Sequence, residues 1–433
     1  MNIALGMLAF IVLAIWAILM CCILGIRGAW KALLNHKWAL PLLFMIIWVS
    51  ICTLIDCSSL EAAFMGDESR LEGILSMLAY AGFAGCALII SDPRRKRALL
   101  LAFWIVSIIM AFLYLVQKAN IGVLANLNST TFCVIFGQMN HHGYYLAMGI
   151  LASAGLFVYE KHPAMKVATA LTVVLLTVCL IINTSLGSFI AAAFALAFLA
   201  VIALVRDGRG KLLAVVPLVL FLAVSLGNVA GLNYRACVAN IGAVITGQEL
   251  AAPDGSSSGA SSTTGGNISS LFADMGKIAS GAEDVGTAGT GRMALWMGSV
   301  QLIGQSPVVG YGMEHGGPLL YELVRTDSDR AHNEVLQWGL YGGVPAMLLY
   351  VAGLAMLAVR QLRRLRQLNP LTVIAIGCVA EYLCSSLFGC VMMTTAPYLW
   401  MFVGFAACLP SSDEHEAGVA PADASLDITR CKE

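Results

Sequence analysis

Charged residues are scarce in this chain. Asp, Glu, Lys and Arg make up 12% of its 433 residues, which is about half the share in an ordinary soluble domain. Acidic and basic residues also balance, with 25 of each and a formal net charge of zero. Because binding to nucleic acid calls for an excess of positive charge, this composition gives no reason to expect a nucleic-acid partner.

Cysteine patterns typical of metal or redox sites are also missing. Most of the 13 cysteines lie within apolar runs, where Cys behaves as a small hydrophobic residue. The sequence contains no C-x-x-C pair, and no spacing of His and Cys indicates a zinc site. The long polar stretch 231–332 contains only Cys237, so we expect no disulfide framework within it.

Apolar runs dominate what is present. Hydrophobic residues make up 59% of the chain, and they recur in runs of about 20 residues, long enough to cross ~30 Å of hydrocarbon. Such runs must be helical in lipid, because only a helix satisfies every backbone polar group within the segment. We therefore predict an all-α, polytopic integral membrane protein. About eleven transmembrane helices are expected, at 3–25, 39–56, 72–91, 98–117, 138–159, 167–183, 188–205, 212–230, 333–358, 371–391 and 396–410.

The basic residues predict the orientation of these spans. Most Lys and Arg residues fall in alternate connecting loops, such as RRKR at 94–97 and RRLR at 363–366. The positive-inside rule places such loops in the cytoplasm. The N-terminus and the loop 231–332 are then outside a cell membrane, and the C-terminus is cytoplasmic. The first apolar run has no basic start and no A-x-A cleavage site, so we interpret it as a span.

The chain divides by composition into four parts. Residues 1–230 carry eight expected spans, residues 231–332 form one long extracytoplasmic loop, residues 333–410 carry three spans, and 411–433 are a tail expected to be disordered. Within the loop, the small polar residues of 251–267 predict a flexible linker, and 268–285 could form a short amphipathic helix.

The end of the long loop carries most of its chemistry. Residues 292–305 are predicted to form a helix that presents Met293, Trp296, Val300 and Ile303 on one face and stops before Pro307. The glycines of VVGYGMEHGGP at 308–318 indicate a tight turn, in which we expect His315 to be exposed.

These motifs resemble those of the bacterial O-antigen ligase and polysaccharide polymerase superfamily. The resemblance covers about 130–360 and also includes FGQMNHHGYYLAM at 136–148 and NTSLGSFIA at 183–191. Its principal motifs are Gly291-Arg292-x-x-x-Trp296, Pro307-x-x-Gly310-x-Gly312, Ala331-His332-Asn333-x-x-Leu336 and Gly343-Val344-Pro345.

The resemblance implies a metal-independent, inverting membrane glycosyltransferase of the GT-C type. Its donor would be a glycan linked to undecaprenyl diphosphate, and its acceptor a glycan, a lipid or a wall polymer in contact with the lipid bilayer. No cofactor is expected. The superfamily commonly has Ser-Arg-Gly at its short outer turn, whereas this chain has Ser185-Leu186-Gly187. One ligand for the diphosphate is therefore missing or is supplied elsewhere, by Arg330, Arg325 or Arg235.

The residue types fit this chemistry. A guanidinium stays ionised and binds phosphate oxygens in a bidentate manner, and an imidazole can accept a proton near neutral pH. We therefore predict His332 as the catalytic base and Arg292 as the main ligand for the donor diphosphate, followed by Arg330 and Arg325. The residues expected to support the acceptor or the fold are Asn333, Trp296, Asn140 and His141.

Each assignment has a structural alternative. His332 or Asn333 could simply cap the following helix, and His141 and His142 could bond neighbouring helices. Glu381 lies in an otherwise apolar run, so it should face a cavity or a partner, unless it lies too near the cytoplasmic end to matter.

Three other functions compete with glycan transfer by a metal-independent enzyme. A metal-dependent glycosyltransferase would use carboxylates of the acidic loop 56–72, which has no D-x-D or E-x-D spacing. A transporter or flippase of lipid-linked oligosaccharide would need charged or broken helices, of which the sequence shows little sign beyond Glu381, and often an internal repeat. A non-catalytic scaffold gives no reason for the spacing of Arg292 and His332.

Overall fold

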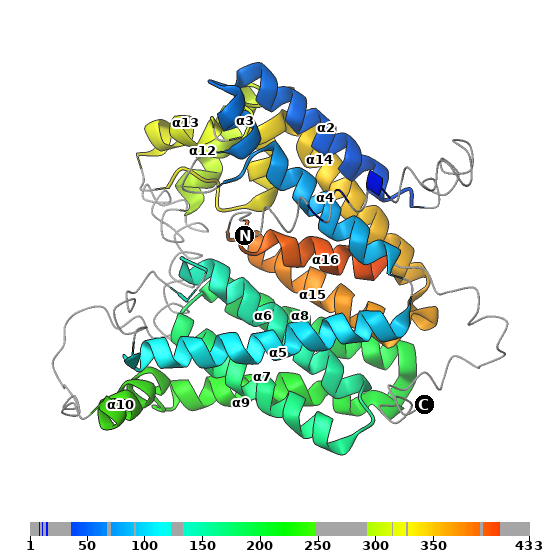
Figure 1. Cartoon of the computed structure of the whole chain (residues 1–433), viewed down its shortest axis with the longest axis vertical. Helices are drawn as coiled ribbons and strands as arrows, with labels where there is room; N and C mark the ends of the chain where they lie inside the picture. Colours follow the sequence, from blue (N-terminus) through cyan, green and yellow to red (C-terminus); the bar gives the residue numbers. More distant parts are fainter. Residues whose placement is uncertain are drawn as a thin grey trace, which may run out of the picture. The chain divides into compact units, whose positions relative to one another are not determined.

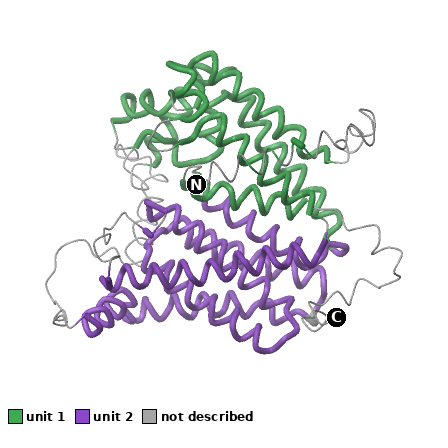
Figure 2. The backbone as a smooth tube through the Cα atoms, viewed as in Figure 1, with its two compact units in different colours: residues 1–90, 273–365, 386–409 green, residues 91–272, 366–385, 410–433 purple. Residues whose placement is uncertain are grey.

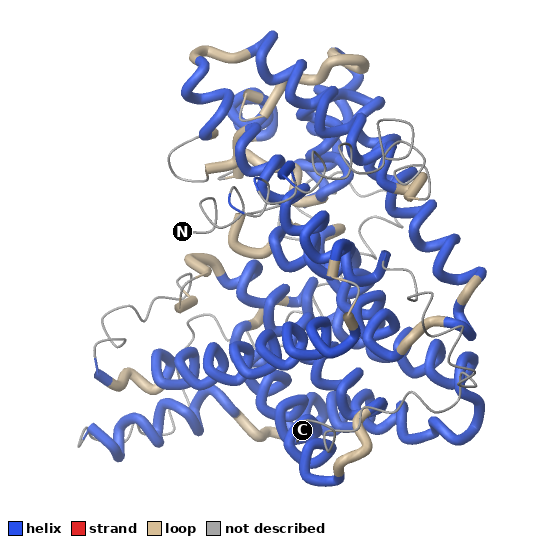
Figure 3. The backbone as a smooth tube through the Cα atoms, turned by 45° about the vertical axis from the view of Figure 1, so that its right-hand side comes forward, coloured by secondary structure: helices blue, strands red, loops and turns tan. Residues whose placement is uncertain are grey.

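The described part of the chain is helical. The computed structural model describes residues 36–66, 71–90, 92–122, 133–134, 136–246, 292–313, 315–325, 328–389 and 393–407, together with residues 8, 11, 14 and 15. Every regular element in these ranges is a helix, and none is a strand (Figures 1 and 3). The expected linker 251–267, the helix at 268–285, the tail 411–433 and nearly all of the first span lie outside the described residues.

Six of these helices are long and apolar enough to cross a membrane, which confirms the class of an integral membrane protein. They are α2 (Ala39–Asp56), α5 (Pro93–Lys118), α7 (Pro163–Asn183), α8 (Leu186–Asp207), the stretch Lys211–Val229 that ends in α9 (Val216–Val229), and α14 (Glu334–Arg363). The shorter apolar helices are α4 (Ile74–Ile89), α15 (Pro370–Ser386) and α16 (Ala396–Ala407). Together with α6 (Met139–Tyr159), these helices lie at ten of the eleven expected positions, while the full count stays a prediction.

Helix starts follow recognisable local signals. The carboxylate of Asp92 accepts a hydrogen bond from the backbone N–H of Arg94 at 2.8 Å, and Pro93 occupies the first turn of α5. Pro163 likewise occupies the first turn of α7. Proline suits this position because it lacks only an N–H that would have no partner within the helix, and its fixed φ is already helical.

The helices form two compact units, shown in Figure 2. Unit 1 comprises 1–90, 273–365 and 386–409. Within it, α14 packs along α2, and α16 packs against α4. The close approach of α14 to α2 depends on Gly353, since a Cβ there would lie 2.5 Å from a side-chain carbon of Leu42.

Unit 2 comprises 91–272, 366–385 and 410–433. Helix α6 is its centre: every residue from His141 to Leu156 is buried, and α6 packs against α5, α7 and α8. A Cβ at Gly155 would lie 2.4 Å from Ile374 of α15. The other elements of unit 2 are η2 (Gly208–Val215) and α10 (Tyr234–Thr246).

Helix α14 is broken, which the expected continuous span did not anticipate. Gly342 and Gly343 have non-helical backbone angles, with φ of −144° and 66°. The freed backbone groups pair with the turn after α12: Tyr311 N–H donates to the Leu340 carbonyl at 2.8 Å, and Val344 N–H donates to the Pro307 carbonyl at 2.8 Å. Pairing within the protein is what allows irregular backbone in a membrane segment.

This break explains two of the glycine motifs. A Cβ at Gly310 would lie 2.6 Å from the Leu340 carbonyl oxygen, and one at Gly343 would lie 2.5 Å from the Pro307 carbonyl oxygen. Both residues also have positive φ, where glycine carries no steric penalty. The indole of Trp48 completes the junction by donating to the Gly342 carbonyl at 2.9 Å.

Candidate functional site

Helix α12 begins at Arg292 and ends at Gln305, which confirms its predicted bounds. The face that carries Met293, Trp296, Val300 and Ile303 is only partly the buried one. The buried apolar residues are Leu295, Leu302 and Ile303, whereas Val300 is 59% exposed. The reason is that α12 packs against both α13 and α14, which rotates its buried face away from the one that the apolar spacing indicates.

Helix α13 (Gly316–Val324) was missed, because the glycines before it were interpreted as part of a turn. Leu320 of α13 is fully buried against α12. A Cβ at Gly298 of α12 would lie 2.5 Å from Val324, so the two helices approach closely there. The apolar residues Leu320, Leu323 and Val324 were the signal that could have identified it. His315 directly precedes α13 and is half-buried, not exposed as predicted.

His332 lies at the junction of α12 and α14. The indole N–H of Trp296 donates to the His332 backbone carbonyl at 3.4 Å. Arg292 precedes Trp296 by four residues, so both lie on one side of α12. The contact therefore brings the face of α12 that carries Arg292 to the backbone of His332.

The backbone of His332 is in an uncommon conformation. Its φ is 47°, in the left-handed region that non-glycine residues seldom occupy. Such conformations cost roughly 1–3 kcal/mol and persist where neighbouring contacts enforce them, often at functional sites.

Asn333, not His332, caps α14. Its side-chain oxygen accepts from the Leu336 N–H at 3.1 Å, and its side-chain nitrogen donates to the Leu387 carbonyl at 3.2 Å. The capping alternative is therefore confirmed for Asn333, while His332 precedes the capping residue by one position.

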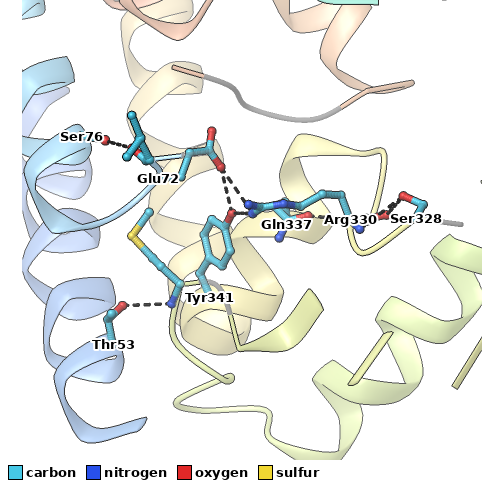
Figure 4. A network of polar contacts seen from close by, with 10 residues as sticks. Thr53, Glu72, Ser76, Ser328, Arg330, Gln337 and Tyr341 are labelled. Atoms are coloured by element: carbon cyan, nitrogen blue, oxygen red, sulfur yellow. Dashed lines mark hydrogen bonds and ion pairs between the residues drawn. The ribbon is translucent and has the colours of Figure 1, made fainter. Parts of the chain in front are cut away.

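Arg330 lies in a buried polar network, shown in Figure 4. Its guanidinium lies 3.4 Å from a carboxylate oxygen of Glu72 and donates to the hydroxyl of Tyr341, which donates to the same Glu72 oxygen at 3.3 Å. The sequence analysis did not identify Glu72, because nothing in the local pattern of 71–73 indicates a partner so far along the chain. Arg325, in contrast, is exposed and ends α13 with a φ of 56°.

Two of the residues predicted to support the acceptor or the fold, Asn140 and His141, belong to unit 2. The side-chain oxygen of Asn140 accepts from Ser185 at 3.3 Å, and Ser185 also bonds Ser188 at 3.0 Å. Leu186, which replaces the expected Arg, begins α8 and is half-buried. His141 is buried in α6, and its part in an acceptor site stays a prediction, as does that of Asn140.

His142 bonds a neighbouring helix, as its structural alternative predicts. Its ring nitrogen Nδ1 lies 3.3 Å from the side-chain nitrogen of Asn183 in α7. The ring stacks on Phe136 at a centroid distance of 5.3 Å and meets Tyr114 edge-on at 4.5 Å. This environment accounts for a buried histidine without a catalytic role.

Glu381 is fully buried and has a hydroxyl partner. Its carboxylate accepts from Ser385 at 2.7 Å, and the Ser385 carbonyl accepts from Tyr144 at 3.0 Å. Glu381 lies five residues before the end of α15 at Ser386, on the side away from the basic loop 363–366. The partner is thus polar and neutral, and Glu381 lies in the half of α15 that is farther along the chain from the basic loop.

Metal ligands do not gather among the described residues, where no group of three His, Cys, Asp or Glu residues is placed to hold an ion. The acidic residues Asp67 and Glu68 lie outside the described residues.

Comparison with known proteins finds a family model that matches part of the chain. Residues 171–351 match the O-antigen ligase family, a span that runs from α7 into α14. It contains Arg292, Trp296, Arg325, Arg330, His332 and Asn333. No curated protein matches the chain closely enough to count as a relative. The family match confirms the resemblance to the O-antigen ligase and polysaccharide polymerase superfamily.

Proposed function

We propose that this protein moves an oligosaccharide from undecaprenyl diphosphate to an acceptor hydroxyl. Its match to the O-antigen ligase family implies a membrane enzyme of the glycosyltransferase type. The reaction would take place on the outer face of the cell membrane, without a metal ion, and would invert the configuration of the transferred sugar. The distribution of basic loops supports the proposed orientation, with the N-terminus and the loop 231–332 outside.

The contact between Trp296 and His332 carries the proposal. It joins the helix that begins with Arg292 to the residue best suited to act as a base. We assign the donor diphosphate to Arg292, because a sugar diphosphate is already a good leaving group and needs its charge stabilised more than it needs an acid. Near a medium of low dielectric constant, such a charge pairing is worth more than in water.

His332 would take the proton of the acceptor hydroxyl. As the O–H bond breaks, the acceptor oxygen forms a bond to the anomeric carbon on the face opposite the diphosphate. The bond from that carbon to the diphosphate oxygen breaks, and undecaprenyl diphosphate leaves with the electron pair. The position of His332 supports this assignment, because it directly precedes the capped start of α14 and its backbone is bonded by Trp296.

The other arginines differ in their suitability. Arg325 is exposed and could reach a diphosphate, and we retain it as the second donor ligand. The ion pair of Arg330 with Glu72 makes it a weaker candidate for this role. In unit 2, the exposed Arg235 of α10 is the other candidate to replace the Arg missing at Leu186.

Transport of lipid-linked glycan is the second candidate, since α14 is a broken helix of the kind that transporters use. The sequence shows little sign of such breaks, whereas the structure has one at Gly342 and Gly343. The break nevertheless supports transport weakly, because backbone groups around it pair with the protein's own turn at 307–312.

Transfer by the purified protein in detergent distinguishes these functions. The donor would be the lipid-linked glycan extracted from the source cells, supplied with their envelope acceptors. An enzyme forms product with no gradient and no second leaflet, and a metal-independent one does so in excess EDTA. Loss of activity in EDTA would indicate the metal-dependent alternative, and no product at all would favour the transporter. Glycans of a deletion strain separate a polymerase, which would lose chain length, from a ligase, which would leave long chains on their carrier.

A further inference from the structure

We propose that Glu72 is a positioning residue for His332 and acts through Arg330. This inference rests on the proposed function, because it assumes that His332 is the base. It assigns a role in the reaction to the loop between α3 (Leu60–Met65) and α4, which lies far outside the matched residues 171–351. It also gives Arg330 a role other than binding the donor.

The first argument is the burial of two charges. Glu72 is 2% exposed and Arg330 is 3% exposed. A buried charge is costly unless it is paired and hydrogen-bonded, and removing one partner leaves the other uncompensated. The pair at 3.4 Å, with the Tyr341 hydroxyl bonded to both side chains (Figure 4), satisfies this requirement. Arg330 is therefore fixed in place by Glu72.

The second argument is that Glu72 is itself rigidly placed. A Cβ at Gly66 would lie 2.5 Å from the backbone of Glu72, and one at Gly73 would lie 2.4 Å from the Phe64 carbonyl oxygen. The segment that carries Glu72 is thus pressed against the end of α3. The hydroxyl of Ser76, in the first turn of α4, donates to the Leu71 carbonyl next to it. The backbone that carries Glu72 is thus held by packing, and its carboxylate by Arg330 and Tyr341.

The third argument is that the ion pair between Glu72 and Arg330 constrains the backbone at His332. Arg330 precedes His332 by two residues, and between them the Ala331 N–H donates to the side chain of Gln337 at 3.0 Å. On the other side, Asn333 is fixed by its cap and by Leu387. The backbone is therefore held on both sides of His332, which accounts for its left-handed φ of 47°. Without the carboxylate of Glu72, one of these anchors is lost.

The test compares Glu72→Gln with Glu61→Gln. Both substitutions remove one carboxylate from the same region, but Glu61 is exposed on α3. Transfer is measured with purified protein in detergent and extracted lipid-linked glycan. We expect Glu72→Gln to lower kcat roughly 100-fold, the typical effect of a small misplacement of a catalytic group, with KM for the donor little changed. Glu61→Gln should match the wild type, and Glu72→Asp, which keeps the charge, should recover part of the loss.

A second readout needs no substrate. Diethyl pyrocarbonate modifies accessible imidazoles, and its reaction with each histidine can be followed by mass spectrometry. We expect His332 to react several-fold faster in Glu72→Gln than in the wild type, because its backbone is released. The exposed His162 of unit 2 serves as the reference for reagent dose. An unchanged rate at His332, or a wild-type kcat in Glu72→Gln, would overturn the inference.

Tyr341→Phe covers the case in which Glu72→Gln does not fold. It removes only the hydroxyl that bridges Glu72 and Arg330, and it should lower kcat in the same direction by a smaller factor. A Tyr341→Phe protein with wild-type kcat would contradict the inference. If His332→Ala is inactive while these variants are fully active, only the positioning role fails. If His332→Ala is active, the proposed function fails with it.

Discussion

The indole N–H of Trp296 donates a hydrogen bond to the backbone carbonyl of His332 at 3.4 Å. Trp296 also packs against Phe388 at a centroid distance of 6.1 Å. The first interaction ties α12 to the residue that precedes the cap of α14, and the second anchors the indole itself. The helix that begins with the predicted donor ligand, Arg292, is thus tied to the backbone of the predicted base through one side chain.

Replacing Trp296 with Phe should lower the rate of transfer about fivefold. The substitution keeps much of the aromatic packing but removes a hydrogen bond worth roughly 1 kcal/mol. The initial rate with purified protein measures the effect. Trp104→Phe is the matched control, because Trp104 is a buried indole of α5 whose N–H has no hydrogen-bond partner among the described residues. Equal rates in the two variants would show that the Trp296 hydrogen bond is unimportant.

Arg292→Lys should reduce kcat/KM for the lipid-linked donor roughly 10- to 100-fold. The ammonium keeps the charge, but it cannot form two parallel hydrogen bonds to phosphate. Arg364→Lys, at an exposed arginine that follows α14, controls for the loss of a guanidinium elsewhere. Near-normal donor kinetics in Arg292→Lys would count against its role with the diphosphate.

Asn333→Ala should destabilise the protein by about 1 kcal/mol, the usual cost of losing a helix cap. The loss of the bond to Leu387 adds to this cost. Asn333→Asp keeps the capping oxygen but not the donor, so its melting temperature in detergent should lie between those of the wild type and the alanine variant. The opposite order would mean that capping contributes less than the bond to Leu387.

Gly343→Ala should destabilise α14 by more than ~1 kcal/mol. Alanine is disfavoured at a φ of 66°, and its Cβ would lie 2.5 Å from the Pro307 carbonyl oxygen. Gly304→Ala provides the contrast, since Gly304 lies within α12 and a Cβ there meets nothing within 4 Å. That substitution should be neutral or slightly stabilising. A melting temperature for Gly343→Ala as high as that of Gly304→Ala would contradict the described break.

Local patterns predicted much of this structure. The apolar run at 39–56 gave the bounds of α2, and the spacing that ends before Pro307 gave those of α12. Both depend on short-range physics: the need to bury apolar side chains and the inability of proline to continue a helix. The capping role of Asn333 follows from its residue type in the same way.

Long-range contacts were not predictable in this way. Tyr341 and Glu72 are 269 residues apart, and neither periodicity nor a local motif indicates that they meet. The break in α14 was missed for the same reason. The motif at Gly343 was recognised from the resemblance, but the turn at 307–312 that pairs with the broken backbone is distant in sequence. The buried face of α12 depends on α13, whose start was hidden by glycines.

The initial rate of glycan transfer by purified His332→Ala tests the central claim most directly. The wild type and His162→Ala, in which an exposed histidine of unit 2 is replaced, are measured beside it, and a melting curve verifies that each protein is folded. We expect His332→Ala to be folded and at least about 100-fold slower, in line with the usual contribution of a general base, while His162→Ala matches the wild type. A folded His332→Ala protein that transfers glycan at a rate close to that of the wild type would contradict the account.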